Sequence, residues 1–169
     1  MTDELRTEAV RETVEFAKKN GVKIAITLSD RSVIDVFGDA FRDVIGDGVD
    51  LIFCNKDEAL AFTGTSNLDF AVEKLKLITK AFAITDGAKG AIIFDGELVF
   101  RSDGVSVKAI DTNGAGDMFA GAFLYAMTSG KSYHWAAKLA NNCASRVITQ
   151  FGPRLGRHEF NVIKAQFVI

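Results

Sequence analysis

The chain has 169 residues, of which 48% are hydrophobic and 25% charged, the balance of a folded domain with its own core. Its formal net charge of -2 at pH 7 gives no basic footprint for a nucleic-acid partner. No apolar run is long enough to span a membrane, and charged residues recur from Asp3 to Lys19, unlike a secretory leader. Cys54 and Cys143 lie in apolar surroundings without metal-ligand spacing, which predicts buried free thiols. A cytoplasmic enzyme is the simplest class.

The first half of the chain alternates helix-like and strand-like segments. Apolar residues at helical spacing predict helices over residues 5–20, 30–45 and 68–79, and a shorter helix that ends at Thr63-Gly64. Runs rich in β-branched residues predict strands over residues 22–28 and 51–54. Ser29 or Asp30 is expected to cap the second helix. This alternation indicates a parallel sheet with helices on its faces.

The pattern changes after residue 80, where β-rich runs follow one another without helices between them. Strands are predicted over residues 82–85, 91–94, 98–100 and 105–110, with a hairpin turn at Asp95-Gly96. Helices are predicted over residues 115–128 and 133–149, followed by a loop over 151–157 and a helix or a frayed tail over 158–167. The expected fold is an open, mostly parallel α/β sheet flanked by helices.

The segment Asp111-Thr112-Asn113-Gly114-Ala115-Gly116-Asp117 joins a β-like run to a helix. The first amides of a helix have no intrahelical partners and carry partial positive charge, so small residues there let an anion approach closely. Asp117 places a carboxylate beside that anion site, which makes sense if a nearby hydroxyl must lose a proton. The competing interpretation is a small-residue turn before a helix whose first-turn aspartate is mildly stabilising.

The whole segment resembles the D-T-x-G-A-G-D signature of the ribokinase-like (PfkB) family of sugar and nucleoside kinases. The resemblance implies that Asp117 is the base that deprotonates the substrate hydroxyl. It also implies that the amides of Gly114, Ala115 and Gly116 form the anion hole for the transferred phosphoryl group.

Asn55-Lys56-Asp57-Glu58 stands where a strand ends and a helix begins, the edge at which open α/β sheets bind ligands. Its residues also fit a capping box, which needs no ligand. In the resembled family the N-x-x-E motif serves the metal and the nucleotide. The resemblance implies that Glu58 helps to hold the water shell of Mg2+ and that Asn55 lies near the nucleotide phosphates.

The segment from Thr85 to Gly90 is glycine-rich and fits a plain hairpin turn. It also matches the family's T-x-G-x-x-G pattern, which borders the nucleotide, so the resemblance assigns that role to Thr85, Asp86, Gly87, Ala88, Lys89 and Gly90. Asn141 lies inside a predicted helix, where asparagine is unfavourable. Exposure or side-chain capping would explain it, whereas the resemblance implies that it reaches the nucleotide.

A monovalent-cation site, for K+, is a further implication of the resemblance. The positions that match it are Asp111, Asn113, Val147, Gln150, Gly152 and Gly156. Most of the ligands would be backbone carbonyl groups, so residue identity carries little information about this site.

Members of the resembled family are nearly twice as long as this chain. Residues 1–169 are expected to form a single partial domain, the C-terminal nucleotide-binding and catalytic half, without the N-terminal substrate-binding and lid part. Little activity of the chain alone is then expected, because positioning and water exclusion dominate phosphoryl transfer. Uncovered apolar surface predicts a homo-oligomer or association with the missing half.

These features predict an ATP-dependent phosphotransferase that moves the γ-phosphoryl group to a hydroxyl of a small-molecule sugar or nucleoside. ATP, Mg2+ and K+ are the expected cofactors, and neither nucleic acid nor membrane is expected as a partner. Asn113 and the loop Phe151-Gly152-Pro153-Arg154 look most like adenosine-kinase-type members. Two alternatives stay open, a nucleotide-binding fragment or subunit without activity of its own, and a plain α/β domain whose turns only close the fold.

Overall fold

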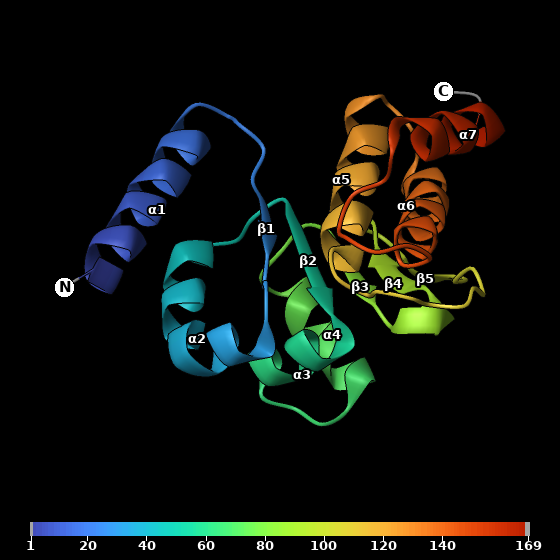
Figure 1. Ribbon diagram of the computed structural model, residues 1–169. Coiled ribbons are helices and arrows are strands. Elements are labelled where there is room, and N and C mark those ends of the chain that lie inside the picture. The colour runs from blue at the N-terminus through green and yellow to red at the C-terminus, as the bar shows by residue number, and fades with distance from the viewer. Residues whose placement is uncertain (1, 168–169) are drawn as a thin grey trace. The chain divides into compact units, whose positions relative to one another are not determined.

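The computed structural model describes the backbone of residues 2–167 and the side chains of residues 7–167. Five strands form one open sheet in the order β1-β2-β3-β4-β5 (Figure 1). Their bounds are β1 Ala25–Thr27, β2 Leu51–Asn55, β3 Phe82–Thr85, β4 Ala91–Phe94 and β5 Val99–Ser102. Strands β1 and β2 run parallel, with Ala25 opposite Leu51 and Thr27 opposite Phe53. The expected α/β class and the parallel pairing of these two strands are confirmed.

The helices lie where apolar periodicity predicts them, with ends that differ by a few residues. They are α1 Thr2–Lys19, α2 Arg31–Ile45, α3 Lys56–Thr63, α4 Leu68–Lys76, α5 Ala115–Thr128, α6 Tyr133–Val147 and α7 Arg157–Phe167, with a 3-10 turn η1 at Gly87–Lys89. Asp30, rather than Ser29, caps α2 by accepting a hydrogen bond from the Ser32 amide. None of the helices between residues 2 and 167 combines the length and hydropathy of a membrane span.

The predicted strand over residues 105–110 is wrong. Residues 103–110 have no strand geometry, and Val105, Val107 and Ile110 are exposed. The Ile110 amide instead donates to the carbonyl of Ile148, at 2.7 Å, beyond the end of α6. Alternating apolar residues resemble a half-buried strand, but tertiary packing decides whether such a run joins a sheet.

Two compact units make up the chain. The first comprises the residues up to Ile84 together with Phe94–Leu98, and the second comprises Thr85–Ile93 together with the residues from Val99 onward. The second unit is built around the pair α5 and α6, where Phe119 and Phe123 of α5 are buried and α6 contributes buried alanines. Small residues on α6 let the two helices approach closely. Cys54 and Cys143 are buried and neither is in a disulfide, as predicted, and burial raises the pKa of Cys143 to about 11.

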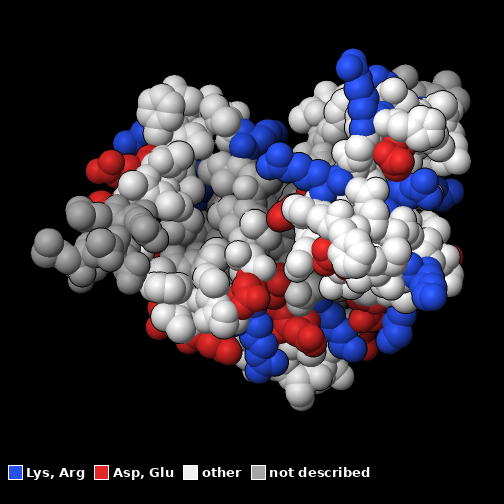
Figure 2. Space-filling view, viewed as in Figure 1, with Lys and Arg blue, Asp and Glu red and all other residues white. Residues whose placement is uncertain are grey.

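In the first unit, β2 is buried from Leu51 to Cys54, which is why its sequence is continuously apolar rather than alternating. The helices of this unit pack in chain order, α1 on α2, α2 on α3 and α3 on α4. Arg42 joins two of them, since its Nη2 donates to the Phe62 carbonyl at 2.9 Å and its guanidinium lies 5.3 Å from the centre of the Phe62 ring. Lys and Arg alternate with Asp and Glu among larger uncharged areas on the face shown in Figure 2.

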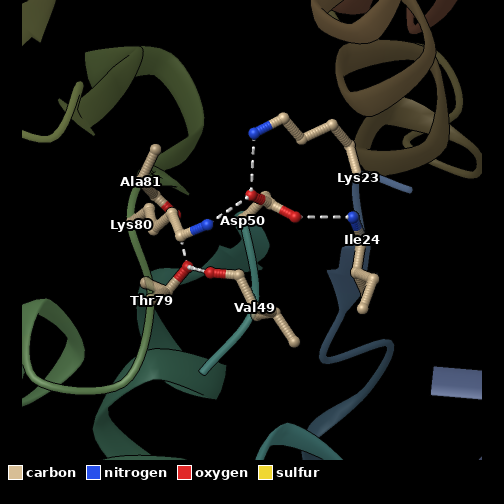
Figure 3. A network of polar contacts seen from close by, with 7 residues as sticks. All are labelled: Lys23, Ile24, Val49, Asp50, Thr79, Lys80 and Ala81. Atoms are coloured by element: carbon tan, nitrogen blue, oxygen red, sulfur yellow. Dashed lines mark hydrogen bonds and ion pairs between the residues drawn. The ribbon is translucent and has the colours of Figure 1, made fainter. Parts of the chain in front are cut away.

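Asp50 is the centre of a polar network at the amino ends of the strands in the first unit (Figure 3). One carboxylate oxygen accepts from the Ile24 amide at 2.9 Å, and the other accepts from Lys23 and Lys80 at 3.3 and 3.0 Å. Beside it, the Thr79 hydroxyl reaches the Val49 carbonyl at 3.1 Å. Thr79 therefore pairs with Val49 next to the sheet. Helix α4 ends at Lys76 and does not extend to residue 79 as predicted.

Replacing Asp50 by alanine should lower the free energy of unfolding by about 1–3 kcal/mol, the cost of leaving a partly buried amide without its charged acceptor. Lys23→Ala and Lys80→Ala are the matched controls, and each should cost less than about 1 kcal/mol because exposed ion pairs contribute little. Urea unfolding at neutral pH measures all three. A loss for Asp50→Ala no larger than for the two lysine variants would contradict this assignment.

The same carboxylate makes the stability depend on pH. Burial alone would raise the pKa of Asp50, but the Ile24 amide and the two lysines outweigh it and hold the pKa below the ordinary value of 3.8. A depressed folded pKa stabilises the fold above the unfolded pKa, and this stabilisation is lost as pH falls through the folded pKa. As the pH falls below about 3.8, the free energy of unfolding of the wild type should therefore decrease more steeply than that of Asp50→Ala.

Candidate active site

Gly114 is the N-cap that precedes helix α5, and its position requires glycine. Its φ of +76° lies in the left-handed region, and a Cβ there would stand 2.5 Å from the Cβ and 2.8 Å from the carbonyl oxygen of Pro153. Gly116, two residues further on, is exposed and has open space where a side chain would be. The loop that carries Pro153 therefore packs directly on the start of α5, while the next residues of the first turn stay accessible.

Two cavities of the second unit border this first turn. The α5–α6 cavity, of about 370 Å3, is lined by Ala115 and Gly116 together with residues of β3, η1, the 104–109 segment and α6. The α5–α7 cavity, of about 840 Å3, is lined by Asp117 together with residues of α5, α6, the 153–157 loop and α7. Neighbouring residues of one helical turn thus face two different spaces.

The walls of the two cavities differ in chemistry. The α5–α6 cavity has an apolar side that includes Val105, Val107 and Ile148, and polar groups that include Thr112 and Ser145. Such a wall suits a flat, largely apolar group that also carries hydrogen-bonding atoms.

The α5–α7 cavity brings cationic side chains near a carboxylate. Asp117 is exposed, and Arg154, Arg157 and Lys164 line the same cavity. An exposed carboxylate at this place is free to accept a proton from a ligand hydroxyl, and helix-terminus amides beside it stabilise negative charge. The first turn of α5 therefore places helix-start amides beside a carboxylate, and the roles of these groups as anion site and proton acceptor stay predictions.

The predicted nucleotide turn forms the rim of the α5–α6 cavity. Thr85, Gly87, Ala88 and Gly90 line this cavity, and the Asp86 amide donates to the Gly90 carbonyl at 2.8 Å to close the turn. Asp86 and Lys89 form an ion pair with each other at 3.6 Å, and the Lys89 side chain is largely exposed. The structure therefore brings the motif together with the start of α5, although its nucleotide role stays a prediction.

Asn141 also lines the α5–α6 cavity, from α6. It is buried, and its Nδ2 lies 3.1 Å from three acceptors, the carbonyl and hydroxyl of Ser102 and the carbonyl of Asp103. Sequence reasoning missed Ser102 and Asp103, and nothing in the sequence around them marks a partner in α6.

Asn55 and Glu58 lie in the first unit, where they form a closed capping box at the start of α3. Asn55 accepts from the Glu58 amide at 2.8 Å, while the Glu58 carboxylate accepts from the amide and the side chain of Asn55 at 2.9 and 2.6 Å. Burial raises the pKa of Glu58 above its ordinary value, against the bond from the Asn55 amide, and Asp30 and Asp57 raise it further. The capping role is thus present, and the metal role stays a prediction.

The positions predicted for a monovalent cation are engaged in structural bonds. Asp111 accepts from the Asn113 amide and from the Gly152 amide, both at 3.0 Å, and these bonds lower its pKa. Gln150 donates to the Arg154 carbonyl at 2.7 Å. Val147 is buried in α6, and the Gly156 carbonyl accepts from the Phe160 amide at 3.1 Å. Asp111 therefore fastens the 150–154 loop to the start of α5, and the K+ site stays a prediction.

Among the described residues, no group of three or more His, Cys, Asp and Glu side chains could hold a metal ion by itself. Any metal bound through Glu58 would therefore take its remaining ligands from water or from the substrate, as Mg2+ commonly does.

Pro153, the only proline of the chain, was visible in the sequence as part of a loop. Its contact with Gly114 was not.

The sequence matches the family model of the pfkB family carbohydrate kinases over residues 1–159. Among curated proteins, the chain is 29% identical over 166 residues to the ribokinase of Lactococcus lactis, a match over 96% of the chain and 52% of the relative. It is 30% identical over 151 residues to the 5-dehydro-2-deoxygluconokinase of Bacillus subtilis, a match over 85% of the chain and 46% of the relative. The chain thus spans about half the length of the curated relatives it matches.

The chain also matches about half the length of related proteins whose structures have been solved. The adenosine kinase of Sinorhizobium meliloti superposes with a TM-score of 0.87 at 34% identity, over 94% of this chain and 49% of that one. A protein described as ribokinase II from E. coli, solved in complex with ATP and Mg2+, superposes with a TM-score of 0.82 at 25% identity, over 94% of this chain and 53% of that one.

Proposed function

Because the chain belongs to the pfkB family of carbohydrate kinases, we propose that it carries the nucleotide-binding and phosphoryl-transferring part of an ATP-dependent kinase. The acceptor would be a hydroxyl of a small sugar or nucleoside. One observation carries the proposal: the first turn of α5 borders the α5–α6 cavity through Ala115 and Gly116 and the α5–α7 cavity through Asp117. Donor and acceptor of a phosphoryl group need two spaces that meet at one anion site.

Each group of residues has a part in this reaction. The glycine-rich turn around Gly87 and Gly90 would border the donor nucleotide in the α5–α6 cavity. The amides of Gly114, Ala115 and Gly116 would stabilise the charge that develops on the transferring group, since helix-terminus amides favour anions. Asp117 would take the proton of the acceptor hydroxyl in the α5–α7 cavity. Positioning and charge stabilisation are the main contributions a protein makes to phosphoryl transfer.

Glu58 is proposed as the residue that organises Mg2+, which, when bound, neutralises phosphate charge. Oxygen donors suit this cation, and a contact through water fits best because the carboxylate already accepts two bonds from Asn55.

Among acceptors, we favour a nucleoside of the adenosine type. The segment Asp111-Thr112-Asn113-Gly114 and the loop over residues 151–154 are the features of the chain that resemble adenosine-kinase-type members. The S. meliloti adenosine kinase also has the highest identity of the two solved structures compared, 34%. Offering adenosine, ribose and fructose side by side in a turnover assay tests this preference.

A second candidate is a nucleotide-binding chain that does not turn over alone. The observation that favours it is the length relation, because the chain covers only 52% and 46% of the two curated kinases. This candidate predicts ATP binding without acceptor-dependent ADP formation. Size-exclusion chromatography would test the associated prediction that the chain forms an oligomer or needs a partner.

Calorimetric titration with ATP, with and without Mg2+, tests the proposal, together with the variant Glu58→Gln. We expect wild-type chain to bind ATP and Mg2+ to strengthen the binding, whereas Glu58→Gln should lose most of that Mg2+-dependent gain, about tenfold for one charged contact. Gln keeps the volume of the side chain but only one of the two oxygens that accept from Asn55, so the free energy of unfolding of the variant is measured alongside as the control for the cap of α3.

Absence of ATP binding by a folded wild-type chain would overturn the proposed function. Equal Mg2+-dependent gains in wild type and Glu58→Gln would leave nucleotide binding intact and reduce Glu58 to its capping role. The two outcomes are separate, because the first concerns the second unit and the second concerns one residue of α3.

A further inference from the structure

Helix α6 and the glycine-rich turn are linked by a short stretch of backbone at the end of β5. Asn141 of α6 is 7% exposed and donates through Nδ2 to the Ser102 carbonyl, the Ser102 hydroxyl and the Asp103 carbonyl, each at 3.1 Å. Ser102 is itself buried. An amide group has two hydrogens, so these three acceptors share both of them. The Asn141 amide hydrogens are therefore directed to residues 102 and 103.

The same stretch of backbone touches the glycine-rich turn with no space for a side chain between them. A Cβ on Gly90 would lie 2.1 Å from the Ser102 carbonyl oxygen, and a Cβ on Gly104 would lie 2.4 Å from the Ala88 carbonyl oxygen. Neither separation is sterically allowed, so two glycines from different segments are required for the two backbones to meet. Gly90 also has a φ of +88°, which favours glycine in its own right.

We propose that Asn141 is a positioning residue: it holds residues 102–104, and these hold the turn at residues 86–90 in the wall of the α5–α6 cavity. Ser102 and Gly104 take part in the same chain of contacts from Asn141 to the turn. The inference rests on the proposed function only for the identity of the ligand, a nucleotide whose phosphates lie beside the turn.

The hydrogen-bond donors of Asn141 distinguish this role from a direct contact with a phosphate group. Phosphate oxygens only accept hydrogen bonds, and the Asn141 donors are already used by Ser102 and Asp103. Asn141 can therefore offer a nucleotide only its Oδ1, and no phosphate oxygen can bond to that atom. Its effect on phosphate binding must pass through the turn that it holds.

Hydrogen exchange of the ligand-free protein tests the device without any nucleotide. The amides of Lys89 and Gly90 donate inside the turn, to the carbonyls of Asp86 and Gly87 at 3.1 Å each. We expect these two amides to be protected in wild type and to exchange about tenfold faster in Asn141→Ala, the effect of losing roughly one net hydrogen bond.

Asn142→Ala is the matched control, because its neighbouring side chain donates to Lys138 of the same helix and not to residues 102–104. Exchange at Lys89 and Gly90 should be unchanged in this variant. The proposal would be overturned by unprotected amides in wild type, or by equal exchange rates in Asn141→Ala and Asn142→Ala.

A double-mutant cycle in ATP affinity distinguishes positioning from direct contact. Asn141→Ala and Gly104→Ala should each weaken ATP binding by about five- to tenfold, and the double variant should be little worse than the weaker-binding single variant, because residues in one device are not additive. Independent, multiplying losses would show that Asn141 acts on the nucleotide separately and would overturn the proposal.

A variant that disturbs the packing less than Asn141→Ala or Gly104→Ala keeps the test valid if those two variants misfold. Ser102→Ala keeps both backbone acceptors of Asn141 and removes only the hydroxyl, so about a two- to threefold change in exchange and in affinity is expected. A change at Lys89 and Gly90 no larger than in the Asn142→Ala control would count against the proposal. Should wild type not bind ATP at all, the proposed function fails, while the exchange experiment still decides whether Asn141 positions the turn.

Discussion

Replacing Asp117 by asparagine is expected to lower the turnover number of phosphoryl transfer by about 10²- to 10⁴-fold, the usual contribution of a general base. Asparagine keeps the size of the side chain but cannot take up the proton of the acceptor hydroxyl. ATP affinity should change by less than about threefold, because Asp117 lines the α5–α7 cavity and not the α5–α6 cavity. Acceptor-dependent ADP formation and calorimetric titration with ATP measure the two quantities.

Asp69→Asn provides the matched control. Asp69, like Asp117, is an aspartate in the first turn of a helix, so both variants lose the same favourable interaction with the helix dipole. Only Asp117→Asn should lose turnover. If the chain alone forms no ADP, the same variants are to be measured in a fusion with the part of the S. meliloti adenosine kinase that this chain does not span. Turnover unchanged by Asp117→Asn would remove the base from the mechanism.

Gly116→Ala is expected to weaken ATP binding by about 10- to 100-fold while the fold stays intact, since one or two bonds to a charged group are each worth roughly 1.5–3 kcal/mol. Gly116 has open space around its Cα and lines the α5–α6 cavity, so a methyl group there would occupy the approach to the first-turn amides. Its free energy of unfolding should stay equal or rise by up to about 1 kcal/mol, because alanine is the better helix former. Calorimetry and urea unfolding give the two numbers.

Gly114→Ala, unlike Gly116→Ala, should lower the stability of the fold. The residue has a φ of +76°, and its Cβ would collide with Pro153, so the free energy of unfolding should fall by about 1–3 kcal/mol. A fall in stability for Gly116→Ala that parallels its fall in affinity would show that both glycines serve the fold, and would contradict an anion site at this turn. Comparison of the two variants therefore separates ligand approach from loop packing.

Local signals in the sequence predict elements well where side chain and backbone interact within a few residues. The capping box of Asn55 and Glu58, the cap at Asp30 and the glycine after Thr63 all lie where the pattern places a helix end. The continuous apolar run from Leu51 to Cys54 likewise predicts a buried strand. These features are readable because their energy comes from contacts at short separation along the chain.

The run over residues 105–110 shows where such reasoning fails. Its alternation of apolar and polar residues favours a strand, but Val105 and Val107 line a cavity and Ile110 binds the backbone after α6. Whether an apolar side chain joins a core or the wall of a binding space depends on what packs beside it, and no local pattern encodes that.

The α/β class, most element positions and the turn into a helix over residues 114–117 can be predicted from the amino-acid sequence, because periodicity, capping and the need for small residues act locally. Packing between distant segments places Ala115 and Gly116 at one cavity and Asp117 at another, brings Pro153 onto Gly114, and sets the Asn141 side chain against Ser102. These relations join residues far apart in the chain, 39 positions in the case of Asn141 and Ser102, so they follow from how the helices pack and not from any single segment.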